Sequence, residues 1–257
     1  MGVVKIHLSG LFIFALLSLT GCQLGGHRIS TRTPHIPVFP EIVKDKNATT
    51  SNPYWNHFTV YNDEISIKLS NGSNYRTHNP MIIGALGTHY RFEKNYYLFM
   101  MTEGAGAQYD WFPGVSQKIS LSLYGGFDVN HGAQVSYARE VGEFLNGKVT
   151  PYISLQRRTV NIYLLCRPNP ETGTCAYNDY VGWNEVWFKQ QVVNVVLGLQ
   201  LGRFKLGEKG RTTVNFKGEL GWNHVLSHEI DRERFPAEPE YYKDSLMIGI
   251  HAGFNLW

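Results

Sequence analysis

Apolar and polar side chains alternate strictly in several long segments of this 257-residue chain, and this alternation constrains its fold more than any other feature. Between positions 214 and 223, every even position carries an apolar residue or glycine, and every odd position carries a polar residue or glycine. Successive side chains of a β-strand point to opposite faces, whereas a helix would need a period of about 3.6 residues. The segment is therefore predicted to be a strand, and residues 193–201, 117–128 and 245–256 share the pattern.

Eight segments of this kind lie between residue 80 and the C-terminus, and turn residues such as glycine, proline and asparagine separate them. No segment has a sustained helical period. We therefore predict a single all-β domain over residues 57–257, built as an antiparallel up-and-down β-barrel of about eight strands. The predicted strands are residues 80–92, 96–111, 117–129, 133–143, 148–163, 186–204, 211–226 and 245–257.

The connections between the predicted strands differ in length at the two ends of the barrel. Three of them, with the sequences FPGVS, FLNG and KLGEKG, are short, whereas residues 164–185 and 227–244 form long connections at the other end. Short turns at one rim and long outward loops at the other are typical of outer-membrane barrels, which this sequence resembles. Aromatic residues near the strand ends would then lie at the membrane interfaces.

Alternation alone does not decide which face of the barrel meets lipid. Predicted strands of 11 residues or more are long enough to cross a bilayer, which favours a membrane barrel. A lipid-anchored soluble binding protein of the lipocalin type, with its apolar face inside, is the alternative. Because bacterial barrels have an even number of strands, the extra alternating segment at residues 57–69 is expected to lie outside the wall. Residues 57–79 are accordingly predicted to be a periplasmic or plug segment.

The N-terminus begins with a short basic region and continues as an uncharged apolar run from residue 8 to residue 19. This run is shorter than the ~20 residues of a membrane-spanning helix and fits a signal peptide. Its end, Leu19-Thr20-Gly21-Cys22, resembles the lipobox of bacterial lipoproteins. The resemblance implies a signal peptide at residues 1–21 and a fatty-acylated anchor at Cys22 in the outer membrane. Residues 22–56, which contain four prolines, are predicted to be a lipidated, partly extended tether.

The two remaining cysteines, Cys166 and Cys175, lie in the sequence CRPNPETGTC, which is rich in turn residues. An even pair of cysteines in an exported protein predicts a disulfide, because the compartment is oxidising. Closing so short a loop would stabilise the fold by roughly 2–3 kcal/mol.

Candidate chemistry is confined to the sequence WNHVLSHEIDRE, where His224, Ser227 and Glu229 lie near the outer end of a predicted strand. These residue types resemble those of outer-membrane barrels that deacylate or acylate lipid A, and they suit nucleophilic catalysis. Their spacing differs from the His-x-Ser pattern of the deacylases, and a solvated polar rim with a charged loop is the preferred explanation. Nothing in the sequence predicts a metal site or a cofactor, and a dispersed net charge of +3 does not predict nucleic-acid binding.

These features together predict a lipid-anchored outer-membrane β-barrel with a structural or surface-interaction role. Its partners would be outer-membrane lipids and a protein or ligand at the long loops 164–185 and 227–244. The alternatives are a lipid A-modifying barrel enzyme that uses His224, Ser227 and Glu229, and the lipid-anchored soluble binding protein. Enzyme activity is left open by the sequence.

Overall fold

The computed structural model describes thirteen stretches of the chain, and every regular element in them is a β-strand. None of the described residues belongs to a helix long and apolar enough to span a membrane. The described stretches are residues 29–32, 36–42, 54–63, 65–69, 74–77, 85–91, 93–101, 104–126, 131–164, 186–206, 212–230, 239–241 and 244–255.

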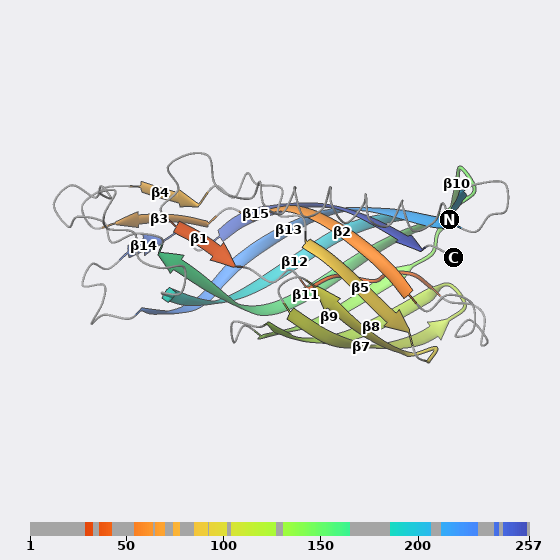
Figure 1. The fold of residues 1–257 in the computed structure, drawn as a ribbon, viewed down its shortest axis with the longest axis horizontal. Helices are drawn as coiled ribbons and strands as arrows, with labels where there is room; N and C mark the ends of the chain where they lie inside the picture. Colours follow the sequence, from red (N-terminus) through yellow and green to blue (C-terminus); the bar gives the residue numbers. More distant parts are fainter. Residues whose placement is uncertain are drawn as a thin grey trace, which may run out of the picture.

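Ten strands form a closed antiparallel wall in which chain neighbours pair in sequence order, and the last strand pairs with the first (Figure 1). The prediction of an all-β, antiparallel up-and-down barrel of the outer-membrane type is confirmed, with ten wall strands in place of about eight. The wall consists of β2 (Tyr54–Asp63), β5 (Ala85–Arg91), β6 (Tyr96–Met101), β7 (Gly104–Gly114), β8 (Gln117–Gly126), β9 (His131–Arg139), β11 (Gly147–Leu164), β12 (Val186–Leu206), β13 (Thr212–Ile230) and β15 (Asp244–Asn255).

The first additional wall strand arises because residues 96–111 fold back on themselves as β6 and β7, with Tyr96 opposite Tyr109. Glycines allow this close hairpin. A Cβ on Gly106 would lie 2.3 Å from Phe99 Cζ of β6, and one on Gly104 would lie 2.4 Å from the carbonyl oxygen of Gly125 on β8, the other neighbour of β7. Glycine in a strand permits such a close approach of neighbouring chain segments. The alternation pattern in the sequence did not reveal the turn that separates these two strands.

The second additional wall strand is β2, so the expectation that residues 57–79 lie outside the wall is wrong for residues 57–63. Strand β2 pairs with β15 on one side and with β5 on the other, and it closes the barrel. The rest of this segment forms β3 (Ile65–Leu69) and β4 (Asn74–Thr77), which join β14 (Pro239–Tyr241) in a separate three-stranded sheet. Because residues 96–111 also contribute an extra strand, the wall keeps an even number.

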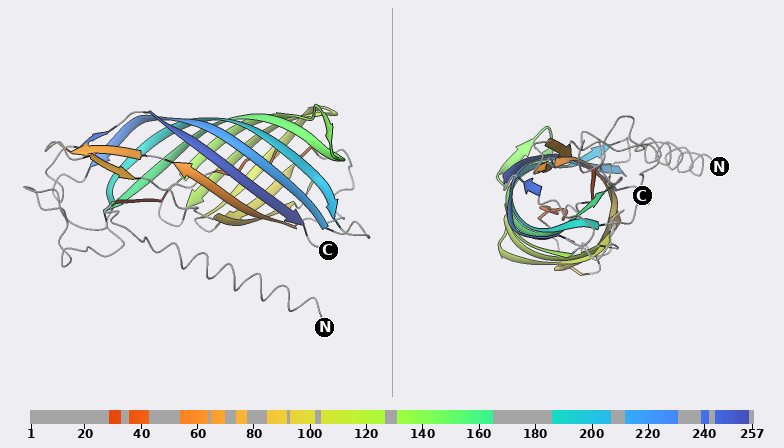
Figure 2. Two further views of the ribbon diagram at one scale, coloured as in Figure 1. Left: turned by 90° about the horizontal axis from the view of Figure 1, so that it is seen from above. Right: turned by 90° about the vertical axis from the view of Figure 1, so that its left-hand side faces the viewer.

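The barrel has a turn end and a loop end. Connections at the turn end include residues 115–116, 145–146 and 207–211, whereas those at the loop end include residues 64–84, 165–185 and 231–243. At the turn end, Leu145 and Asn146 both have positive φ, as a two-residue type I′ hairpin between β10 (Gly142–Phe144) and β11 requires. The sheet of β3, β4 and β14 lies at the loop end (Figures 1 and 2).

The described wall is polar inside and apolar outside. Its buried inward residues include Gln108, Ser122, Gln134, Asn194 and Asn223. Its exposed outward side chains form rows across neighbouring strands, such as Leu155, Val195, Trp222 and Leu246. A lipocalin-like barrel needs the opposite arrangement, so the soluble alternative does not fit this wall.

The outward apolar rows form a band. On β13 the band extends from Val214 to Trp222, which is about 26 Å along the strand at ~3.3 Å per residue. With a strand tilt of about 40°, this corresponds to about 20 Å between the outermost rows, close to the ~25 Å band of outer-membrane barrels.

Candidate functional site

The barrel lumen holds a segment of its own chain. Residues 36–42, with the sequence IPVFPEI, are all buried and belong to no strand. They run inside the ring of strands (Figure 2, right-hand view). Two prolines keep such a segment extended and free of a backbone hydrogen-bond ladder, so its carbonyl groups need partners from elsewhere.

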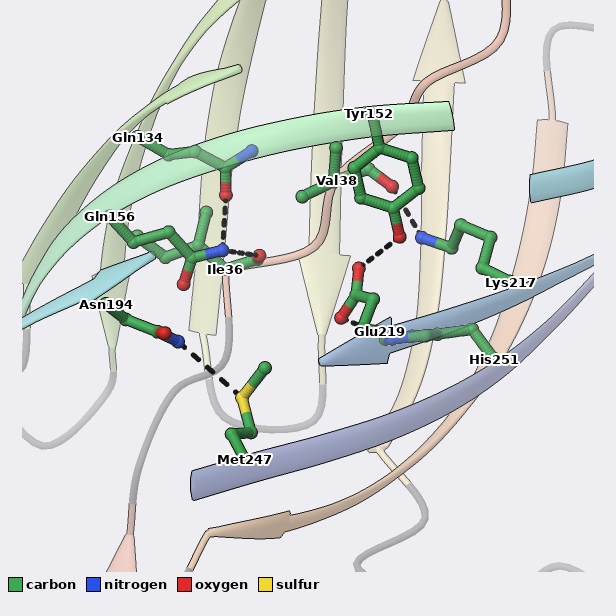
Figure 3. Close-up of polar contacts among 10 residues, drawn as sticks. All are labelled: Ile36, Val38, Gln134, Tyr152, Gln156, Asn194, Lys217, Glu219, Met247 and His251. Carbon is green, nitrogen blue, oxygen red and sulfur yellow. Dashed lines mark hydrogen bonds and ion pairs between the residues drawn. The ribbon is translucent and has the colours of Figure 1, made fainter. Parts of the chain in front are cut away.

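Wall side chains supply these partners. Gln156 Nε2 donates to the carbonyl oxygen of Ile36 at 3.0 Å, and Lys217 Nζ donates to that of Val38 (Figure 3). Lys118 Nζ donates to the carbonyl oxygen of Phe39. Side chains from three wall strands, β8, β11 and β13, therefore bind the backbone of the segment, which we call the plug (residues 36–42).

The plug also packs through its apolar side chains. The ring of Phe39 lies 4.5 Å from that of His89 and 5.6 Å from that of Phe99, measured between centroids. Val38 is buried in a cluster with Ala138 and Tyr152. Hydrophobic contacts and hydrogen bonds thus hold the plug to opposite parts of the wall.

Two buried charged side chains of the described lumen, Lys118 and Glu219, have close polar partners. Lys118 lies 3.0 Å from Asp110 Oδ2, and both side chains are at most 1% exposed. Glu219 accepts a hydrogen bond from Tyr152 at 2.6 Å and contacts His251 Nε2 at 2.7 Å (Figure 3). Burying an ion is costly unless it is paired and hydrogen-bonded, so these contacts are what allow Lys118 and Glu219 to be buried in the lumen.

The plug corrects the prediction that residues 22–56 form a tether. Residues 36–42 are packed inside the lumen, residues 29–32 pair with β11, and residues 54–56 begin β2, so only the remaining parts of that range are still predicted as tether. The prolines suggested an extended linker, and they do keep the segment extended. The overlooked signal was apolar: Ile36, Val38, Phe39 and Ile42 are too hydrophobic for a solvated linker.

A second cluster of functional interest lies on the outer wall, just beyond the apolar band. Here Arg157, Val193, His224 and Asp244 occupy one row across four strands. His224 Nδ1 and Asp244 Oδ1 are 2.6 Å apart, with both side chains about half exposed. A carboxylate in this position can fix the orientation and tautomer of the imidazole.

A bulge brings Ser227 to the same face as His224. Ser227 pairs with Gln191 and His224 pairs with Val193, and the register between them shifts by one residue. Because alternate residues of β12 share a face and paired residues point the same way, both side chains point outward. Two residues separate His224 from Ser227, whereas the His-x-Ser pattern has one residue between them. The bulge takes up the extra residue, so that the two side chains share a face as they would in that pattern. Arg157 Nη2 donates to Gln191 Oε1 at 2.9 Å in the adjoining position.

Only part of the predicted catalytic set is brought together. Glu229 is exposed and pairs with Lys189, two residues beyond Ser227 on the same outward face and further from His224. The acidic partner of His224 is Asp244, which sequence reasoning missed because it lies on a different strand. The described residues contain no group of three or more histidine, cysteine or acidic side chains that could hold a metal ion. Cys22, Cys166 and Cys175 lie outside the described residues, and their roles remain predictions.

Comparisons with known proteins add little to this geometry. No protein-family model matches the chain, and no curated protein shows significant similarity to it. Neisserial surface protein A aligns with 7% identity and a TM-score of 0.31, over 79% of this chain and 96% of the other. OprG from Pseudomonas aeruginosa aligns with 10% identity and a TM-score of 0.29, over 80% and 97%. A bacterial polysaccharide outer membrane secretin gives 9%, 0.28, 80% and 99%. TM-scores this low establish no specific relationship, so the fold assignment depends on the strand pairing itself.

Proposed function

We propose that this chain is an outer-membrane protein, anchored by lipid at Cys22, whose barrel spans the bilayer and is closed by its own plug. Its role is structural or interactive and is exerted at the loop end. The observation that carries the proposal is the inverted wall, because a polar interior with an apolar outer band suits lipid surroundings and no others. The row that follows this band on the loop side contains Arg157, His224 and Asp244, and these polar side chains support a membrane boundary at that level.

The plug and the loop end favour a role in presenting a surface outside the cell over a role in transport across the membrane. Residues 36–42 fill the lumen at the levels where Gln156, Lys217 and Lys118 bind them. At the loop end, two connections far apart in sequence form one sheet through β3, β4 and β14. An ordered platform on a closed barrel suits contact with a protein or ligand outside the cell.

Replacing Cys22 with alanine tests the membrane-spanning barrel. We expect Cys22→Ala to abolish labelling with radioactive palmitate while the protein stays in the membrane fraction after alkaline carbonate washing. The reason is that the apolar band holds the barrel in the bilayer without the acyl chains. Heat-modifiable gel mobility of the purified variant provides the folding control. Release of folded Cys22→Ala protein into the soluble fraction would contradict the proposal.

A second candidate function is hydrolysis or transfer of an acyl ester of an outer-leaflet lipid. The hydrogen-bonded pair of His224 and Asp244, with Ser227 on the same outward face, favours it. In this scheme His224 takes the proton of Ser227 Oγ as that oxygen attacks the ester carbonyl, and gives the proton to the alcohol that leaves when the ester C–O bond breaks. Water or an acceptor alcohol, deprotonated by His224, then removes the acyl group from Ser227, and Asp244 positions the imidazole throughout. Arg157, in the same row, suits the phosphate of an anionic lipid.

Substitution of Ser227 tests this candidate. We expect Ser227→Ala to reproduce the lipid profile of a deletion strain, because loss of the nucleophile lowers turnover by a factor of at least ~100. Mass spectrometry of extracted outer-membrane lipids provides the measurement. Glu143→Ala, an exposed change at the turn end far from the His224 row, is the matched control and should resemble wild type. Identical lipid profiles in wild-type and deletion strains would remove the enzymatic candidate.

A further inference from the structure

The N-terminal part of the chain descends through the barrel in one direction. Strand β1 (Ile29–Arg32) pairs with the loop-end portion of β11, with Ile29 opposite Leu164 and Arg32 opposite Asn161. Ile36 is then bound by Gln156, eight residues nearer the start of β11 than Leu164. The order of contacts along β11 therefore follows the order of the chain from the loop end inward.

The descent continues to the turn end. Val38 is bound by Lys217, and Glu41 Oε1 accepts a hydrogen bond from Asn215 at 2.9 Å, two residues nearer the turn end of β13. The next described residue, Tyr54, begins β2 at the turn end, where Asn56 lies opposite Phe254 of β15. The chain thus enters the lumen at the loop end and leaves it at the turn end.

Chain length limits where Cys22 can lie. It precedes Ile29 by seven residues, which span at most about 25 Å when fully extended. Ile29, opposite Leu164, lies nine residues beyond Leu155 in the last apolar row, or about 23 Å in height for a strand tilted by about 40°. Val149, in the apolar row of Leu201 and Phe216 near the turn end, lies fifteen residues from Leu164, or about 38 Å in height.

We propose that the N-terminal arm is threaded through the barrel and that the acyl chains of Cys22 insert in the leaflet on the loop side. This rests on the proposed function, in which Cys22 is acylated and the loop end faces outward. The 25 Å reach extends to the loop-side edge of the apolar band and falls short of the turn-side edge. A lipid anchor in the periplasmic leaflet is therefore incompatible with the threaded arm.

Epitope insertion tests the proposal in intact cells. A short epitope inserted between Gly26 and His27 marks the chain next to the anchor, on the N-terminal side of β1. The same epitope between Arg234 and Phe235 marks the loop end, and one between Glu208 and Lys209 marks the turn end. We expect antibody to bind the first two tags in intact cells, and to bind the third only after the outer membrane is permeabilised.

The three tags separate failure of the threading from failure of the proposed function. A Gly26 tag hidden in intact cells, beside an accessible Arg234 tag, overturns the threading alone. A hidden Arg234 tag or an accessible Glu208 tag overturns the proposed barrel orientation. Heat-modifiable mobility confirms that each tagged protein folds.

A cross-link tests the path of the arm without insertion. In a Cys166→Ser/Cys175→Ser background, Val38→Cys and Ala138→Cys place two thiols in one buried cluster. We expect oxidation to join them in the folded full-length protein, giving a shift in gel mobility that reductant reverses. The matched pair Val38→Cys with Val135→Cys, whose wall residue points outward, should stay unlinked. Failure of the first pair to link in folded protein overturns the threading.

Discussion

Replacing Lys118 with methionine is expected to destabilise the folded barrel by about 3–5 kcal/mol, the usual cost of breaking a buried ion pair from one side. The Lys118 side chain is 1% exposed and joins Asp110 on β7 to the carbonyl oxygen of Phe39 in the plug. Methionine keeps most of the volume but leaves a buried carboxylate and a plug carbonyl without their donor. Unfolding in urea, followed by the heat-modifiable gel shift, provides the measurement.

Two further variants check the cause of this effect. Adding Asp110→Asn to Lys118→Met removes the uncompensated charge and should recover part of the lost stability. Lys148→Met removes an ammonium that pairs with Glu140 and Glu143 at the exposed turn end, and should leave unfolding unchanged. Equal stability of Lys118→Met and wild type would show that the lumen does not depend on this pair.

Replacing residues 36–42 with a glycine-serine segment of equal length is expected to turn a closed barrel into a conducting one. The wall behind the plug is polar, and buried atoms of Ser154 and Gln190 have no hydrogen-bond partner among the described residues, so water can wet it. Wild-type protein should give no steps of current in planar bilayers, whereas the replaced variant should give discrete channel openings.

The same replacement at residues 231–237, in a loop-end connection, is the matched control and should leave the barrel closed. Heat-modifiable mobility shows whether each variant still folds. Equal conductance of wild-type and plug-replaced protein would mean that residues 36–42 do not close the lumen.

The fold was largely predictable because alternation records which side chains share a face of a strand. Alternation could not reveal the hairpin between β6 and β7. The glycines at the start of β7 have no side chain, so they do not indicate which face of the strand each position occupies. It also could not assign β2 to the wall, because that depends on the free edge of β15, nearly two hundred residues away in the chain. The strand count therefore failed where the deciding contact was distant or lacked a side chain.

The candidate sites were predictable only in part for the same reason. His224 and Ser227 were found from residue type, but their shared face depends on a bulge that forms when β13 pairs with β12. The plug was missed because its partners, Lys118, Gln156 and Lys217, lie on three distant strands. A proline-rich segment has the same local pattern whether it is solvated or enclosed.

The seam between β15 and β2 has a consequence for how the protein is made. Because β2 is the first wall strand and β15 the last, the ring can close only after the whole wall has been synthesised. Residues 36–42 precede β2, so they are synthesised before every wall strand and are present when β15 pairs with β2. The arm would then be held between its acylated end on the loop side and β2 on the turn side. It could leave the closed ring sideways only if the β15–β2 seam reopened.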